Sequence, residues 1–165
     1  MSETQPTTRQ AALVPASETA DAPILYVLFV VDGTTFALPA SLVLQMETFN
    51  GATAVPGTPA WVSGIIQLRG RVIPVVDLRA RFGLPNVPRT IDTRVVVGDL
   101  DDRTVALVAD SAREVARIAP SQLKPPPRIV DLGARGFIRA VAQLGERTVM
   151  VLDFAKVIGE EPIDV

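Results

Sequence analysis

The stretch Trp61–Leu84, WVSGIIQLRGRVIPVVDLRARFGL, carries the pattern that decides the fold. It contains two apolar, β-rich runs, Val62–Leu68 and Val72–Asp77, which are separated only by the tripeptide Arg-Gly-Arg. So short a gap with a glycine in it is typical of a β-hairpin whose tight turn uses that glycine. A short helix is predicted over Leu78–Phe82, because a glycine and then a proline follow it.

The same pattern occurs again 76 residues further along the chain. Residues 65–83, IIQLRGRVIPVVDLRARFG, align with residues 141–159, VAQLGERTVMVLDFAKVIG, and the apolar positions agree almost throughout. The preceding strands repeat more weakly, since residues 29–40 align with residues 97–109. This self-similarity indicates two copies of one β-rich half-domain.

The rest of the chain is predicted to form further short strands joined by tight turns. Outside the central unit, the predicted strands are 24–31, 35–38, 46–49, 94–98, 104–109, 115–118, 137–144 and 148–153. Helical turns are expected at 40–44 and 154–158, and residues 86–90 are interpreted as the linker between the halves. About ten short strands at close spacing predict an all-β fold of two small barrels with a few short helices.

The composition excludes several classes of function. Hydrophobic residues make up 48% of the 165-residue chain and aromatic residues only 5%, so the core must consist mostly of Val, Leu and Ile. Histidine and cysteine are both absent, which removes Ser-His-Asp and Cys-His catalysis, phosphohistidine chemistry and ordinary zinc sites. Residues 1–23 carry the whole net charge of −2, and a balanced remainder argues against nucleic-acid binding. Direct membrane insertion is not expected, since no apolar run is long enough to span a bilayer.

The carboxylates are interpreted as structural. The cluster Asp99, Asp101 and Asp102 lacks the glycine and glutamate that a calcium-binding loop needs, and it is interpreted as a solvated hairpin turn. Asp77 and Asp153 occupy matching places in the two copies, each at the end of a strand. They are expected to cap the following helices, the alternative being a carboxylate pair for acid–base chemistry.

Arg69 is the strongest candidate for contact with a partner. It lies in a turn with apolar flanks, and the second copy has Gly145 at the matching position, so the turn has specialised. An exposed guanidinium there can form bidentate hydrogen bonds to a carboxylate of a partner. For Arg79 and Arg81, simple solvation of the surface remains as open as a role in binding.

Four apolar residues have two possible roles. By default they belong to the core, and the alternative is that some of them line a groove between the halves that takes an amphipathic helix. These residues are Val43, Leu44, Ile65 and Val115.

The central stretch resembles the signature of the CheW family of bacterial chemotaxis coupling proteins, G-x-x-N-L-R-G-x-x-x-P-x-x-D-L-R. The positions in register are Gly64, Leu68, Arg69, Gly70, Pro74, Asp77, Leu78 and Arg79. Gln67 replaces the asparagine of the pattern, and Ser63 stands where a basic residue is usual. The resemblance extends over residues 24–159.

The resemblance implies two five-stranded SH3-like β-barrels around a shared core, and an adaptor without catalysis, cofactor or metal. Such adaptors bridge the regulatory domain of a CheA-type histidine kinase and the cytoplasmic tip of chemoreceptors. Arg69 carries over by position as the signature arginine that coupling needs. Val43 and Val115 carry over as apolar residues of the receptor-facing groove. Gly64 carries over as a tight position beside this groove, and Ile65 is counted among the partner-binding residues.

Three segments are expected: a disordered tail over 1–22, a CheW-like domain over 23–160 and a C-terminal tail over 161–165. The resemblance also implies a cytoplasmic protein that is recruited to membrane-associated receptor arrays, a monomer when alone and part of a ring with the kinase. Two alternatives stay open. One is a coupling protein of another kinase pathway, such as pilus motility, surface sensing or development, and the other is a small ligand-binding β-barrel.

Overall fold

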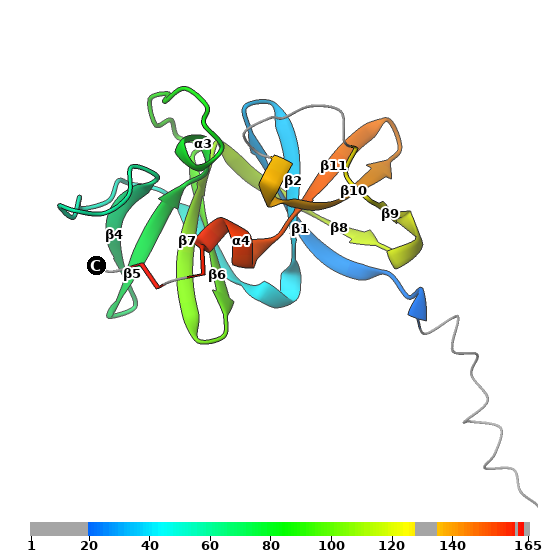
Figure 1. Ribbon diagram of the computed structural model, residues 1–165, viewed down its shortest axis with the longest axis horizontal. Coiled ribbons are helices and arrows are strands. Elements are labelled where there is room, and N and C mark those ends of the chain that lie inside the picture. The colour runs from blue at the N-terminus through cyan, green and yellow to red at the C-terminus, as the bar shows by residue number, and fades with distance from the viewer. Residues whose placement is uncertain (1–19, 128–134, 161, 164–165) are drawn as a thin grey trace, which may run out of the picture.

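The computed structural model describes residues 20–127, 135–160 and 162–163, and within them the chain is mostly β-strand (Figure 1). The strands are β1 (Ile24–Val31), β2 (Thr34–Pro39), β3 (Val43–Thr48), β4 (Val62–Leu68), β5 (Arg71–Asp77), β6 (Arg94–Leu100), β7 (Arg103–Ala109), β8 (Ser111–Ile118), β9 (Leu123–Lys124), β10 (Ile138–Leu144) and β11 (Arg147–Leu152). The helical segments are η1 (Ala40–Leu42), α3 (Leu78–Arg81), η2 (Pro120–Gln122), η3 (Arg135–Phe137) and α4 (Phe154–Ile158).

The strands form two sheets, which we call sheet A and sheet B. Sheet A has the order β8-β1-β2-β11-β10-β9, and sheet B has the order β3-β6-β7-β5-β4. The two orders correspond strand for strand once the repeat is applied, apart from the two-residue strand β9. The predicted all-β, internally duplicated fold is therefore confirmed.

Each sheet draws strands from both copies of the repeat. Sheet B combines β3, β4 and β5 of the first copy with β6 and β7 of the second, and sheet A combines β1 and β2 with β8, β10 and β11. Parallel pairing of β2 with β11 and of β5 with β7 joins the copies. The copies have thus exchanged their first hairpins. Residues 86–90, predicted to link two halves, instead lead from α3 to β6, between two parts of sheet B.

Three apolar clusters hold the sheets together. The cluster inside sheet A includes Tyr26, Leu28, Ile118, Val149 and Val151, and the cluster inside sheet B includes Ile73, Val75, Val95, Val97 and Ala106. The shared cluster between the sheets includes Phe29, Phe36, Val76, Val96, Leu107 and Phe154. Because central strands are buried on both faces, their sequences are continuously apolar rather than alternating. The expectation of a shared core is confirmed.

The hairpin between β4 and β5 is tighter than predicted. Leu68 pairs directly with Arg71, so only Arg69 and Gly70 form the turn, and both have positive φ, 50° and 79°. Positive φ at both central residues is the signature of the two-residue turn that suits the twist of a hairpin. Glycine adopts positive φ freely. Arg69 has a side chain, so for this residue the conformation is less favourable and is imposed by the turn.

Two predicted strands are longer in the structure. The weak strand predicted at 115–118 is part of the eight-residue β8, which pairs with β1 along its length. The strand predicted at 46–49 begins at Val43, immediately after η1. Both β8 and β3 are edge strands of their sheets. Half of the residues in each strand are polar, so the apolar pattern in the sequence is weak.

The predicted helix caps are present. The Asp77 carboxylate accepts a hydrogen bond of 2.9 Å from the backbone N–H of Arg79 at the start of α3. The Asp153 carboxylate accepts one of 3.2 Å from the N–H of Lys156 in α4. Both carboxylates therefore satisfy helix N–H groups, as the capping interpretation requires.

The predicted N-terminal tail, 1–22, falls mostly outside the described residues, as do positions 161, 164 and 165 of the predicted C-terminal tail. The last residues of the first tail are attached to the fold. The Asp21 carboxylate accepts hydrogen bonds from the backbone N–H and the hydroxyl of Ser121, at 2.8 and 2.9 Å. Asp21, which was predicted to belong to the tail, therefore contacts the fold.

Candidate partner-binding site

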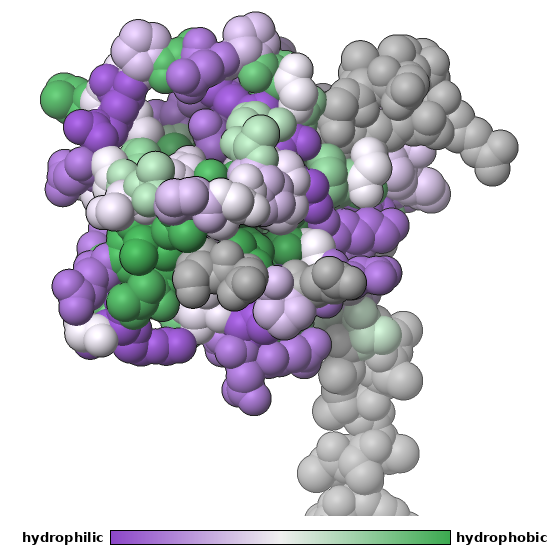
Figure 2. Space-filling view, turned by 60° about the vertical axis from the view of Figure 1, so that its left-hand side comes forward, coloured by the Kyte–Doolittle hydropathy of each residue, from purple (hydrophilic) through white to green (hydrophobic). Residues whose placement is uncertain are grey.

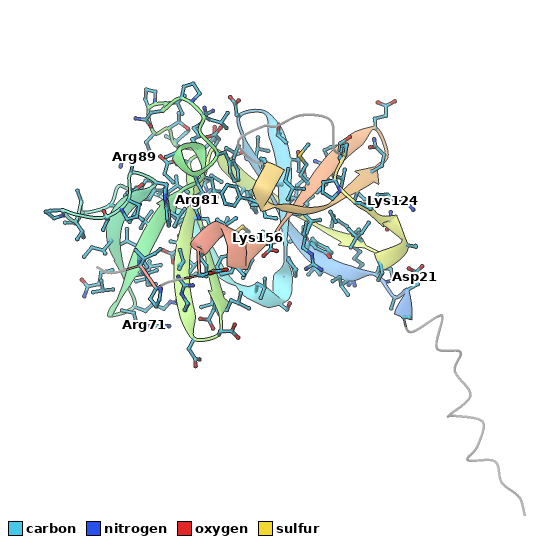
Figure 3. All side chains as sticks on the ribbon, viewed as in Figure 1. Asp21, Arg71, Arg81, Arg89, Lys124 and Lys156 are labelled. Atoms are coloured by element: carbon cyan, nitrogen blue, oxygen red, sulfur yellow. The ribbon has the colours of Figure 1, made fainter. Side chains whose placement is uncertain are left out.

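Two of the four arginines of the central unit lie exposed at the end of the β4–β5 hairpin. Arg69 and Arg71 border a hollow together with Leu44 and Gln45 of β3. Arg71 donates a hydrogen bond of 3.1 Å to the Thr104 hydroxyl (Figure 3). The hairpin therefore presents guanidinium groups beside an exposed apolar side chain, since Leu44 is 55% exposed.

Arg79, whose role the sequence left open, forms an ion pair within the fold. Its guanidinium forms a bidentate pair with the Asp110 carboxylate, with distances of 3.0 Å from Nε and 2.7 Å from Nη2. Asp32 lies 3.5 Å from Nη2, and its backbone N–H donates to Asp110 at 2.8 Å. Because Asp32 lies in the turn after β1 of sheet A and Arg79 belongs to α3 beside sheet B, this network joins the two sheets.

The charges of this network stabilise each other. Burial alone would raise the pKa of Asp110, but the hydrogen bonds from Arg79 and from the Asp32 N–H, with the charge of Arg79, outweigh burial and lower that pKa. The hydrogen bond to Asp110 raises the pKa of Arg79. The Arg79 side chain is only 13% exposed, so its charge is held inside the protein and needs this partner.

Arg81 also joins the two sheets. Its guanidinium carbon lies 3.8 Å from the centre of the Trp61 ring and 4.8 Å from that of Phe137. Nε donates to the Val157 carbonyl at 2.9 Å, and Nη2 to the Lys156 carbonyl at 3.2 Å (Figure 3). Burial lowers the pKa of Arg81. Arg79 and Arg81 therefore make structural contacts, and of the two alternatives left open by the sequence, simple solvation of the surface does not describe them.

A second arginine completes the capping of α4. Arg103, at the start of β7, donates to the carbonyls of Gly159 at 2.6 Å and Ile158 at 3.3 Å. Arg81 of α3 and Arg103 of β7 thus satisfy successive carbonyls at the C-terminal end of α4, which follows β11 of sheet A. Cations are favoured at this end of a helix because its carbonyls carry partial negative charge.

Val43 and Val115 lie on equivalent edge strands, and both face the region between the sheets. Val43 packs against the shared cluster. Val115 pairs with Val27 of β1, so the two side chains lie on the same face of sheet A. Phe29, which belongs to the shared cluster, lies on this face as well. Val115 is 56% exposed, so the default assignment to the core is wrong for it, as it is for Leu44.

A further apolar residue belongs with this face. Leu25 is on the same face of β1 as Val27 and pairs with Arg117 of β8, two pairs away along the strands from Val115. It is 38% exposed. The sequence analysis missed it because Leu25 lies inside a continuous apolar run, where nothing distinguishes an exposed residue from a buried one.

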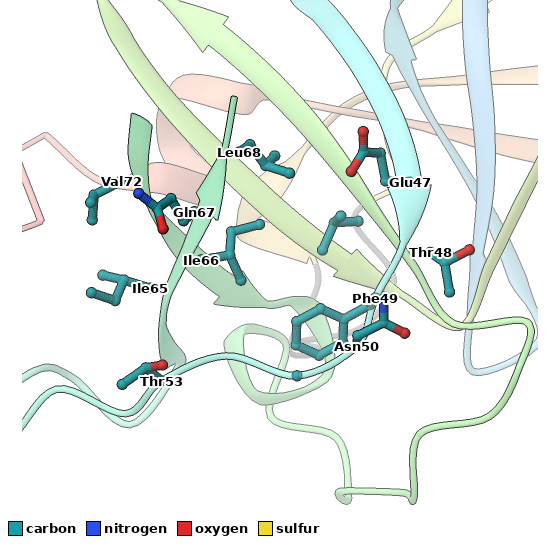
Figure 4. Close-up of a pocket in the computed structure, with 12 residues that line it drawn as sticks. Glu47, Thr48, Phe49, Asn50, Thr53, Ile65, Ile66, Gln67, Leu68 and Val72 are labelled. Carbon is teal, nitrogen blue, oxygen red and sulfur yellow. The ribbon is translucent and has the colours of Figure 1, made fainter. Parts of the chain in front are cut away.

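Gly64 and Ile65 lie on β4, away from Val115. Gly64 is buried with φ 139°, and a side chain there would overlap the carbonyl of Thr53. Ile65 exchanges two backbone hydrogen bonds of 2.9 Å with Thr53 and borders a groove beside β3 (Figure 4). The candidate residues thus divide: Val43 and Val115 face the other sheet, while Ile65 and Arg69 belong to the β4 side of sheet B.

The acidic cluster forms the predicted hairpin turn. Asp101 and Asp102 are the two turn residues between β6 and β7, and Asp99 accepts a hydrogen bond of 2.9 Å from the Thr104 hydroxyl. In the described part of the chain, no group of three or more His, Cys, Asp or Glu residues is placed to hold a metal ion. Within the same ranges, no helix has the length and apolar character needed to cross a membrane.

Comparisons of the sequence and of the structure with known proteins point to the same family. The model of the CheW-like domain family matches residues 25–161. The Chemotaxis protein CheW of Bacillus subtilis is 30% identical over 135 residues, which is 82% of this chain and 86% of that protein. Protein FrzA of Myxococcus xanthus is 30% identical over 138 residues, covering 79% of this chain and 82% of that protein. The crystal structure of the scaffolding protein TtCheW from Thermoanaerobacter tengcongensis superposes with a TM-score of 0.78 at 25% identity, covering 86% of this chain and 99% of TtCheW.

Proposed function

The chain belongs to the CheW-like domain family, and on that premise we propose that it is a non-catalytic adaptor that couples chemoreceptors to a CheA-type histidine kinase in chemotaxis. The observation that carries the proposal is the pair of exposed apolar residues at the edge of sheet A, Val115 of β8 at 56% and Leu25 of β1 at 38%. Exposed apolar side chains that lie together mark a surface that a partner can cover. An adaptor has such a partner.

The receptor side of the proposal uses Val43, Val115 and Leu25. Their faces point toward the region between the sheets, and receptors of this class present a helical tip. An amphipathic helix places its apolar residues along one stripe, which suits a groove bordered by apolar residues from two elements.

The kinase side of the proposal uses Arg69. Its guanidinium is exposed at the end of a two-residue turn beside exposed Leu44, so charge and apolar surface occur together. A partner domain that offers a carboxylate next to an apolar patch would satisfy both. We assign this surface to the regulatory domain of the kinase.

An adaptor transmits a signal only if its contacts differ in free energy between two states of the kinase. The shared cluster and the Arg79, Arg81 and Arg103 contacts join the two sheets of this chain into one body. A displacement at the receptor face is then carried to the Arg69 hairpin instead of being absorbed between the sheets. The adaptor is proposed to be monomeric alone, cytoplasmic, and part of rings with the kinase at receptor arrays.

Isothermal titration calorimetry with the isolated kinase regulatory domain and with a receptor tip fragment tests the proposal. We expect micromolar or tighter binding of each. Arg69→Ala should weaken binding of the kinase domain and leave receptor binding unchanged, and Val115→Asp should have the opposite pattern. Glu146→Ala, an exposed change in the β10–β11 turn of sheet A, is the matched control for Val115→Asp, and Asp101→Asn, in the β6–β7 turn, is the control for Arg69→Ala. Absence of binding to both partners would reject the proposal.

A coupling role in another kinase pathway is the second candidate. The observation in its favour is that FrzA matches this chain at the same identity, 30%, as the Bacillus chemotaxis protein. The same calorimetric titration with the kinases encoded near the gene distinguishes the two. Tighter binding to a kinase that has no chemoreceptor partners would show that the chain acts in that kinase's pathway.

A further inference from the structure

Sheet B has a cavity at the end opposite the Arg69 turn. The strands β3, β5 and β7 end there, and β4 and β6 begin there. The cavity has a volume of about 190 Å³ and lies between these strand ends and the loop 84–93, which rises beside α3 in Figure 1. It has room for about six water molecules. The mouths of β-barrels are a common place for small-molecule sites.

The lining of this cavity is mostly polar. Phe49 and Val108 form its apolar wall, and both also pack against the cluster inside sheet B. The other side of sheet B looks different: where this end of the molecule is turned forward, hydrophobic side chains gather in a recess bordered by hydrophilic ones (Figure 2). A few polar groups converging beside one apolar wall suit a small polar molecule.

The repeat shows that this mouth is specific to sheet B. Ser63 lines the cavity, and its equivalent at the offset of 76 is Arg139 of sheet A. Both residues lie where the pairing within their hairpin shifts register, so each occupies a β-bulge. Bulges direct a side chain away from the regular alternation and often lie beside functional sites. In sheet B the residue in this place is small, and it leaves space that an arginine would fill.

Three polar side chains of the cavity are without partners. Among the described residues, the Ser63 hydroxyl, the Asn86 amide and the Arg89 guanidinium form no hydrogen bond. Arg89, labelled in Figure 3, lies over the Phe49 ring, with 5.8 Å from its guanidinium carbon to the ring centre. Gly51 gives it room, since a Cβ there would lie 2.6 Å from Nη1. A polar ligand in the cavity would satisfy these groups together.

The charges around the cavity leave one anion and one cation available. Arg79 and Asp110 neutralise each other through their bidentate pair. Asp77 uses Oδ1 to cap α3, and within the described residues its Oδ2 accepts no hydrogen bond. Arg89 has no carboxylate partner in the same part of the chain. A molecule with one positive and one negative group would pair with both, whereas a simple anion or cation would pair with only one.

We propose that this cavity binds a small free α-amino acid, whose carboxylate pairs with Arg89 and whose ammonium group pairs with Asp77. Ser63 and Asn86 provide further hydrogen bonds, and the apolar wall accommodates a short side chain. The inference does not depend on the kinase or on the receptor, because the cavity lies at the end of sheet B opposite Arg69.

Titration of the full, isotope-labelled chain with L-alanine, followed by two-dimensional NMR, tests the proposal. We expect saturable shifts of the amides of the 84–93 loop and of Ser63, with a Kd of about 1 mM, because so small a ligand makes few contacts. The amides of the Arg69 turn should not shift. Propionate, which lacks the ammonium group, and ethylamine, which lacks the carboxylate, should each bind about tenfold more weakly or worse.

Two variants locate the site. Arg89→Ala should weaken binding of L-alanine about tenfold, because the carboxylate loses its cation. Ser63→Arg should abolish binding, because it places in sheet B the residue that sheet A has at this bulge. Arg139→Ala, which removes an exposed arginine from the equivalent place in sheet A, is the control and should bind L-alanine normally. The spread of the amide signals establishes that each variant folds.

The opposite results are equally clear. Equal binding by Ser63→Arg, or shifts confined to another part of the chain, would overturn the location. Binding of propionate as tight as that of L-alanine would overturn the class of ligand. No saturation at tens of millimolar L-alanine would overturn the proposal as a whole.

Discussion

Arg79 joins three parts of the chain that are far apart in the sequence, namely α3, the turn after β1 and the link before β8. Asp110→Asn would leave its guanidinium, 13% exposed, without the bidentate carboxylate. We expect a loss of roughly 1–3 kcal/mol in the free energy of unfolding, since a poorly exposed polar group loses its partner. Urea titration monitored by Trp61 fluorescence measures it. Asp101→Asn, in an exposed turn, should change the free energy by less than about 0.5 kcal/mol, and an equal loss there would contradict the role of the pair.

The same pair predicts a dependence of stability on pH. Asp110 has a lowered pKa in the folded protein and an ordinary value near 3.8 in the unfolded chain. The folded state therefore gains stability above the ordinary value, and that gain is lost as the pH falls through the lowered one. Unfolding free energies of the wild type and of Asp110→Asn should differ most above pH 5 and converge toward pH 2. A difference that grows on acidification would contradict this assignment.

Gly64 is the glycine with the least space around it. With φ 139°, it lies in a region that residues with side chains rarely adopt, and a methyl group would overlap the Thr53 carbonyl. Gly64→Ala should lower the free energy of unfolding by about 2–4 kcal/mol, from backbone strain and from overpacking together. Gly136→Ala, in η3 with open space around it, is the control and should be nearly neutral. Urea titration distinguishes the two.

At the level of single residues, the sequence predicted which arginine is exposed but not which are structural. Arg69 lies in a hairpin turn, and a turn residue is exposed wherever the hairpin lies. Arg79 and Arg81 differ from it only through partners more than 25 residues away, Asp110 and Val157. Local spacing carries no information on such contacts, so their roles appear only once the fold is known.

The elements themselves were predictable where the sequence carries turn and cap chemistry. The helix α4 has the predicted bounds, and Asp77 and Asp153 cap their helices as expected. Asp77→Ala and Asp153→Ala should each cost about 1 kcal/mol of unfolding free energy, because an N–H at the helix start loses its acceptor. Glu160→Ala, at an exposed position after α4, is the control for thermal denaturation. A loss confined to one of the two caps would show that the copies are not energetically equivalent.

The two-residue strand β9 was not predicted, and among the longer strands the edge strands β3 and β8 were predicted least well. Residues along β3 alternate between half-buried and exposed, and β8 pairs with a partner on one side only. An edge strand therefore shows a weaker apolar pattern than a central strand such as β6, whose Val95, Val96 and Val97 are all buried. The proposed partner surfaces lie on these edge strands, so the weakest part of the prediction coincides with the candidate site.

The whole molecule should unfold in one step. The shared cluster takes residues from both sheets, and neither sheet can lose its structure without exposing it. The chain has one tryptophan, Trp61, beside sheet B, and one tyrosine, Tyr26, inside sheet A. We expect urea transitions followed by tryptophan fluorescence, tyrosine absorbance and far-ultraviolet circular dichroism to coincide. Separate midpoints for Trp61 and Tyr26 would show that the sheets unfold independently.

At this scale the repeat predicted the strand inventory and the duplication, but not the exchange of hairpins. Self-alignment identifies equivalent segments, such as 65–83 and 141–159, and says nothing about which copy each one pairs with. Consecutive and exchanged arrangements contain the same strands with the same local sequences. Only contacts between distant segments, such as the parallel pairing of β2 and β11, distinguish them.

The exchanged hairpins also determine the order in which the protein is completed on the ribosome. Sheet B is encoded by one continuous stretch, from β3 to β7, whereas the partner of Ala37 in β2 is Val151, about 114 residues later. At a synthesis rate of about 5–20 residues per second, the first hairpin waits roughly 6–23 s for that partner. Its β1 edge is unpaired until β8 has been made, and its β2 edge until β11 has been made. Unpaired edges invite association with other nascent chains. The hairpin that is made first is therefore the part of the newborn chain most dependent on chaperones.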